Sequence, residues 1–142
     1  AMVFRGIVAG YLLGSAYRRR SIRHDALRDS GSDIYNLKPG YPEAIPIRLD
    51  TDGRVQYSME VLDGPPVDCV LMDDRNHTYY TEGLECECYE RGTVYCATAV
   101  ELSMQLPAGQ FVLMVTPAPE TTEQTAKMGD SRVDFAYDID AT

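Results

Sequence analysis

The sequence predicts an all-β protein, an antiparallel β-sandwich of jelly-roll type with seven to eight strands and a short N-terminal helix. Three observations predict this fold. Strand-like segments recur from residue 44 to residue 139, with turn residues between them. Several of these segments alternate apolar and polar side chains, the pattern of a strand with one buried face. The 10 tyrosines suit strands, whose pleated surface accepts aromatic side chains.

The charge divides the chain near residue 30. Residues 1–30 contain six arginines and two aspartates, a net charge of +4, whereas residues 31–142 contain 7 basic and 20 acidic groups, a net charge of −13. Such a split usually means that the two segments face different partners. We therefore divide the chain into a basic leader, residues 1–30, and an acidic sandwich domain, residues 31–142. The acidity of the sandwich argues against nucleic-acid binding, which needs cations for the phosphates.

An apolar run dominates the leader. Residues 6–17 are uncharged and mostly apolar, and they lie between Arg5 and three consecutive arginines. We expect a helix about 18 Å long there, well short of the ~30 Å hydrocarbon core of a membrane. The charge cluster follows the apolar run, whereas a signal peptide carries its charges before the run. We therefore expect neither a membrane span nor a signal peptide, and a cytoplasmic or membrane-peripheral location rather than secretion.

Glycines at every fourth position would give this predicted helix a flat face that a second helix can approach closely. Three alternatives follow: the helix packs on its own sandwich, it associates with another copy, or it attaches to a membrane surface. Attachment would bury the apolar face at the headgroup boundary while the arginines attract anionic lipid. The candidate contact residues are Gly6, Gly10, Gly14, Arg18, Arg19 and Arg20.

Each strand is predicted from its own local pattern. Residues 55–61 alternate cleanly, so one face should be buried and the other wet. Residues 67–72, apart from Asp68, and residues 111–115 are apolar on both faces and should be central strands. Pro42 and Pro46 place the first strand near a sheet edge. The segments predicted as strands are 44–50, 55–61, 67–72, 84–89, 96–105, 111–115 and 133–139.

Turn residues predict how the strands are connected. Arg91-Gly92 predicts a hairpin that pairs residues 84–89 with residues 96–105. Residues 117–130 form a polar connection longer than is typical. The breaker cluster at residues 29–33 separates the leader from the first strand.

Two segments resemble a known family. Residues 67–74, VDCVLMDD, are similar to the VDVYLMD strand of bacterial and archaeal pre-peptidase C-terminal domains and of the related Golgi-dynamics (GOLD) domains. Residues 106–115, LPAGQFVLMV, are similar to the LPAGxYxLxV strand of those domains. The resemblance covers residues 44–139. It implies that the two segments are adjacent structural strands and that the domain is a non-catalytic accessory or interaction module.

The four cysteines are the most informative reactive groups. Cys86 and Cys88 share one strand face, Cys96 lies on the next strand of the predicted hairpin, and Cys69 could complete a set. Three interpretations remain open. The thiols pack as small apolar groups, Cys96 forms a disulfide with Cys86 or Cys88 in an oxidising compartment, or the cysteines bind zinc. The C-x-C-x7-C spacing lacks the usual C-x2-C knuckle of a zinc site.

Acidic turn residues offer oxygen ligands for calcium, although such residues are usually only solvated. The candidates are Asp50, Asp52, Asp63, Asp73 and Asp74. Asn76 begins an N-glycosylation sequon, which matters only if the domain is translocated.

No catalytic motif is evident. Neither His24 nor His77 accompanies a serine or cysteine in a nucleophile motif, and the sequence has no phosphate-binding glycine loop or dinucleotide fingerprint. We therefore expect a non-catalytic sandwich module that forms a homo-oligomer, or docks to an anionic membrane surface, through its leader. The alternative is a metal- or ligand-binding sandwich that uses the cysteines or the acidic loops.

Overall fold

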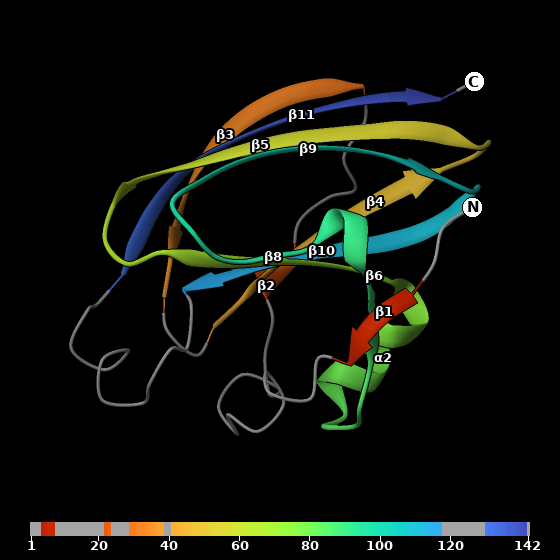
Figure 1. Cartoon of the computed structure of the whole chain (residues 1–142), viewed down its shortest axis with the longest axis horizontal. Coiled ribbons are helices and arrows are strands. Elements are labelled where there is room, and N and C mark those ends of the chain that lie inside the picture. The colour runs from red at the N-terminus through yellow and green to blue at the C-terminus, as the bar shows by residue number, and fades with distance from the viewer. Residues whose placement is uncertain (1–3, 8–21, 24–28, 39–40, 118–129, 142) are drawn as a thin grey trace.

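The computed structural model describes residues 4–7, 22–23, 29–38, 41–117 and 130–141. Within these ranges two β-sheets pack face to face, and a short helix lies beside them (Figure 1). This arrangement confirms the predicted β-sandwich. None of the helices in the described ranges is long and apolar enough to cross a membrane.

The first layer, sheet I, has the strand order β2-β4-β10-β6-β8. Its last four strands are antiparallel, and the short β2 extends the sheet by pairing in parallel with β4. The strands are β2 (Ile22–Arg23), β4 (Glu43–Leu49), β10 (Gly109–Pro117), β6 (Val67–Asp73) and β8 (Val94–Ala97).

The second layer, sheet II, has the strand order β3-β11-β5-β9 and is antiparallel throughout. Its strands are β3 (Ser30–Leu37), β11 (Ser131–Ala141), β5 (Gly53–Asp63) and β9 (Ala99–Leu106). A separate two-stranded sheet joins β1 (Phe4–Ile7) to β7 (Glu87–Tyr89).

The main core lies between the two sheets and follows the predicted alternation. Val55, Tyr57 and Met59 point inward from β5 and pack with Phe135 of β11 and Leu113 of β10. Each fully buried apolar side chain of this size contributes roughly 1.5–3 kcal/mol to stability. The buried Tyr57 hydroxyl finds a partner by donating to a backbone carbonyl 2.8 Å away.

The two strands that are apolar on both faces, β6 and β10, are neighbours at the centre of sheet I, as predicted. Their inward side chains join the main core. Their outward side chains form a second cluster, which Tyr80 completes from outside the sheet. That outer cluster consists of Ala44, Val70, Met72, Tyr80, Cys86, Cys88, Val112 and Met114.

The described helix lies in the middle of the chain and was not predicted there. It is α2 (Asp74–Thr81), and the Asp73 side chain caps its start by accepting a hydrogen bond from the Asn76 N–H. Its end is a Schellman motif: Gly83, at φ +78°, donates to the Tyr80 carbonyl, and Leu84 donates to the Tyr79 carbonyl. The helix sequence is polar, so no apolar stripe revealed it.

The predicted N-terminal helix is not among the described elements. Residues 8–21 lie outside the described residues, and the described leader segments 4–7 and 22–23 are strands. The breaker cluster predicted at residues 29–33 overlaps a strand, because residues 30–37 form β3 at the edge of sheet II.

The predicted hairpin at Arg91-Gly92 is wrong. A 3-10 turn, η1 (Glu90–Gly92), follows β7, and the next strand, β8, pairs with β6 instead of β7. The predicted strand 96–105 is divided between two sheets, because β8 ends at Ala97 and β9 begins at Ala99. Two residues before the break, within β8, Cys96 has a left-handed backbone with φ +54°.

Candidate functional site

The leader reaches the sandwich domain through backbone pairing at two places. β1 runs antiparallel to β7, with Arg5 opposite Cys88 and a register shift between Arg5 and Ile7. Gly6 is therefore the extra residue of a bulge. β2 pairs with β4. The predicted contact residues Gly10, Gly14, Arg18, Arg19 and Arg20 lie outside the described residues.

The acceptor strand β7 lies in an acidic stretch of the chain. Glu85, Glu87 and Glu90 are all exposed, and Glu87 is opposite Ile7 in the pairing. The strand is also tied to the helix, because the Asn76 side-chain oxygen accepts a hydrogen bond of 2.9 Å from the Glu87 N–H. The asparagine of the predicted sequon thus links α2 to β7.

The structure does not bring the four predicted cysteines together. Cys69 is completely buried in the core between the sheets. Cys86 and Cys88 belong to the cluster on the outer side of sheet I, and Cys96 is exposed on β8. All four are thiols in this structure. Among the described residues, no three His, Cys, Asp or Glu side chains are grouped so that they could hold a metal ion.

The buried thiols are poor nucleophiles. Burial, and then the charge of Asp68, raises the pKa of Cys69 to about 12, against the opposing effect of a hydrogen bond with Tyr57. Burial, and then neighbouring Cys88, raises the pKa of Cys86 to about 12. Burial also raises the pKa of Cys88. Since the thiolate is the reactive form, these three thiols should react slowly with electrophiles.

We expect thiol reagents to distinguish Cys96 from the other three cysteines. In the native protein at pH 8, iodoacetamide should modify Cys96 at least about 100-fold faster, because the buried thiols are shielded and hold little thiolate. Peptide mass spectrometry over a time course measures the four rates. Cys96→Ala should remove the fast phase, and comparably fast labelling of Cys69 would contradict the structure.

The other predicted ligands are also dispersed. Asp73 caps α2, and the Asp52 side chain accepts a hydrogen bond of 2.9 Å from the Ala108 N–H in another turn. Asp63 lies at the end of β5, opposite Arg132. His77 is buried on α2 with its ring stacked on Tyr80, at a centroid distance of 6.4 Å. His24 lies outside the described residues.

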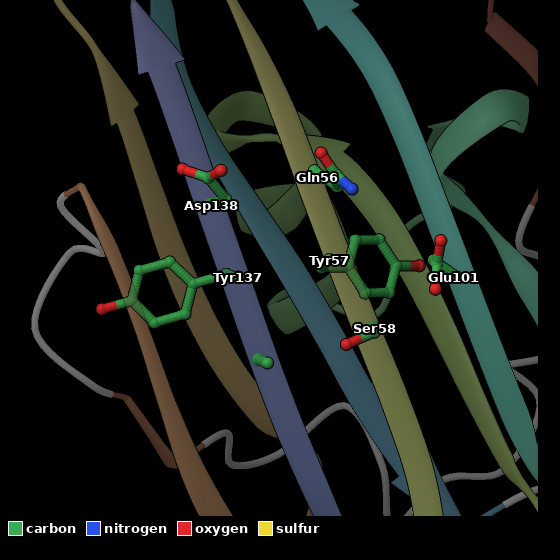
Figure 2. A pocket seen from close by; sticks show the side chains of 7 residues that line it. Gln56, Tyr57, Ser58, Glu101, Tyr137 and Asp138 are labelled. Carbon is green, nitrogen blue, oxygen red and sulfur yellow. The ribbon is translucent and has the colours of Figure 1, made fainter.

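A hollow lies on the outer face of sheet II, and sequence analysis did not identify it. Gln56 and Ser58 project from β5, Glu101 from β9 and Asp138 from β11 (Figure 2). The pairing places Ser58 between Ala136 and Glu101 across three adjacent strands. The short side chains of Ser58 and Ala136 form the bottom of the hollow, and the longer side chains of Glu101 and Asp138 flank it.

The hollow has a volume of about 210 Å³, whereas pockets for small molecules usually measure about 300–1,000 Å³. Its two carboxylates, Glu101 and Asp138, are exposed, and its lining contains no histidine, cysteine or lysine. A small open hollow flanked by two carboxylates suits the recognition of a cationic group.

No protein-family model matches the chain, and no curated protein matches it. Two of the solved structures that are similar in fold show the likeness. The pre-peptidase C-terminal domain of collagenase from Bacillus anthracis has a TM-score of 0.53 and 11% identity, covering 84% of this chain and 95% of that chain. PliG from Aeromonas hydrophila, a periplasmic lysozyme inhibitor of g-type lysozyme, has a TM-score of 0.53 and 8% identity, covering 85% of this chain and 97% of that chain. These matches confirm the sandwich fold implied by the resemblance of residues 67–74 and 106–115.

Proposed function

We propose that this protein is a non-catalytic β-sandwich interaction module that assembles with copies of itself through its leader. In this assembly, β1 of one copy adds to β7 of another. The fold neighbours agree with a non-catalytic role, since one is a collagenase's pre-peptidase C-terminal domain and the other is an inhibitor.

The pairing of β1 with β7 is the observation that carries the proposal. β1 contributes 4 residues to a sheet of two strands that is separate from sheets I and II. A two-stranded ribbon of this length is marginally stable in water. A neighbouring copy can supply the same strand and form the same backbone hydrogen bonds, so exchange costs little.

Charge supports the same assembly. The leader carries +4 and the sandwich domain −13, so leaders attract sandwich domains and sandwich domains repel one another. The acceptor strand has Glu85, Glu87 and Glu90 in or beside it, whereas β1 contains Arg5. A leader placed on β7 of a second copy reduces the local excess of negative charge.

A proline in β1 tests the proposal in the full chain. Arg5→Pro removes a backbone N–H and restricts the residue before it, so it should disrupt the β1–β7 pairing. Arg5→Gln removes the same charge and keeps the backbone donor. The mass is measured by light scattering after gel filtration at about 1 to 100 µM protein, a range in which interfaces of moderate affinity form. The mass of the wild type and of Arg5→Gln should rise with concentration. Arg5→Pro should remain monomeric.

Two results would contradict assembly through β1. One is a wild-type protein that stays monomeric at every concentration, and the other is an Arg5→Pro variant that assembles as the wild type does. Flotation with vesicles of phosphatidylcholine and phosphatidylserine tests the alternative that the leader binds a membrane surface. Vesicle binding by a wild-type protein that remains monomeric would assign the leader to a membrane surface instead.

A further inference from the structure

We propose that the outer face of sheet II is a docking surface for a cationic segment of a partner protein, with an arginine or lysine side chain of that partner seated in the hollow. This surface lies on strands other than β1 and β7, so the inference does not depend on leader-mediated assembly.

The charges on this face are unbalanced. Alternation along the strands places five acidic and two basic side chains on it, and the cross-strand pairing brings them into neighbouring rows. They are Glu60, Glu101, Asp134, Asp138, Asp140, Arg54 and Arg132. Arg54 is already engaged within the face, because it donates to the Ser103 hydroxyl at 2.8 Å and to the Gln56 side-chain oxygen at 3.3 Å. The exposed carboxylates therefore attract cations from outside the chain.

The middle of the face is recessed because its side chains are small. Ala136 of β11 lies between Ser32 of β3 and Ser58 of β5, and Glu101 of β9 completes that row. The resulting hollow of about 210 Å³ is below the usual volume of a small-molecule pocket. A single long side chain fits a recess of this kind, and Glu101 and Asp138 flank it with charge.

One end of the same face is apolar. Ile34 lies in the row of Asp134 and Glu60, and Leu62 follows Glu60 by two residues in β5. Their side chains are 46% and 47% exposed, which is unusual for large aliphatic side chains in this molecule. Protein interfaces combine apolar contacts of this kind with charged groups, whereas a site for a simple cation does not need them. The combination favours a polypeptide partner.

The test uses the full chain and a peptide of six Arg-Gly repeats as the cationic probe, with a peptide of six Glu-Gly repeats as its control. Amide shifts in 15N-correlated NMR spectra should change around Ser58, Glu101 and Asp138 on titration with the Arg-Gly peptide only. The Arg5→Pro variant should bind the peptide as the wild type does, because β1 is not part of this surface.

Matched variants distinguish binding in the hollow from a general attraction of the peptide to the negatively charged chain. Glu101→Gln with Asp138→Asn should weaken binding by about tenfold, since each exposed charge pair contributes modestly. Glu82→Gln with Asp50→Asn makes the same change in net charge at exposed positions outside both the hollow and the β1–β7 pairing, and it should leave affinity within about twofold. Ser58→Arg fills the hollow and should weaken binding at least as much as the first pair. Thr81→Arg adds the same charge on α2 and should not.

Equal weakening by both carboxylate pairs, or shift changes distributed over all acidic regions, would overturn the proposal. A Ser58→Arg variant that binds the Arg-Gly peptide as the wild type does would also overturn it. Circular dichroism of each variant tests whether weaker binding comes from loss of the fold. The fold should be retained, because all the substituted positions are on the surface or in the hollow.

Discussion

Gly64→Ala is expected to destabilise the sandwich by about 2–5 kcal/mol, by combining backbone strain with steric overlap. Gly64 has φ +96° in the turn that carries the chain from β5 in sheet II to β6 in sheet I. A Cβ there would overlap the Asp130 carbonyl oxygen and lie 2.8 Å from the Ser131 Cα. Both are backbone atoms, so no side-chain rotation relieves the contact.

The position of this overlap increases its effect. The buried Ser131 hydroxyl donates to the Pro65 carbonyl at 2.8 Å, which holds the start of β11 against the same turn. Moving Asp130 and Ser131 to accommodate a methyl group would therefore disturb a link between the two sheets. Loss of a buried hydrogen bond of this kind costs about 1–3 kcal/mol in addition to the strain.

Gly109→Ala is the matched control for conformation alone. Gly109 also has a positive φ, +154°, but a Cβ there would meet only the Phe111 ring at 3.6 Å, which is ordinary contact. Urea unfolding should therefore show a clearly smaller loss for Gly109→Ala than for Gly64→Ala. Equal losses would mean that the overlap with Asp130 and Ser131 does not exist in solution.

Local patterns predicted the centre of the fold well. Residues 67–72, apart from Asp68, and residues 111–115 are apolar on both faces, and this pattern is sufficient to place each of them as a central strand. That the two strands are neighbours was implied by the family resemblance. Helix α2 was not predicted because its residues are mostly polar and show no apolar periodicity. Its ends carried the available signal, an aspartate at position 73 that caps the first turn and a glycine at position 83 that ends the last.

Features made by distant residues could not be predicted in the same way. β7 pairs with β1, whose residues lie 80 to 85 positions earlier in the chain, so the short-range hairpin suggested by Arg91-Gly92 gave β7 the wrong partner strand. The hollow depends on Ser58 and Ala136 meeting across two strands, and neither residue is notable in its own segment. Cys69 and Cys86 are separated by sheet I, a division that strand periodicity alone does not reveal.

The second large effect is a loss of stability at alkaline pH. Burial, and then Cys69, raises the pKa of Tyr57 well above its ordinary value of 10.0, and burial raises the pKa of Cys69 from 9.0 to about 12. Both groups hold their protons more strongly in the folded protein than in the unfolded chain. Their contribution is therefore fully present below the unfolded pKa of each group and is lost as the pH rises toward the folded value.

The cysteine contribution can be isolated. With an unfolded pKa of 9.0 and a folded pKa of about 12, Cys69 accounts for a loss of about 2 kcal/mol between pH 8 and pH 10.5. Urea unfolding of the wild type under reducing conditions should show at least this decrease. Cys69→Ala removes the titrating thiol, so its stability should decline by about 2 kcal/mol less over the same pH interval.

Cys96→Ala is the control, because Cys96 is exposed and its removal leaves the buried thiol in place. Its pH dependence should match that of the wild type, with the same decline between pH 8 and pH 10.5. If Cys69→Ala and Cys96→Ala declined equally, the titration of Cys69 would not be linked to folding. Because burial is the main cause of the raised Cys69 pKa, that result would contradict the position of Cys69 in the core between sheets I and II.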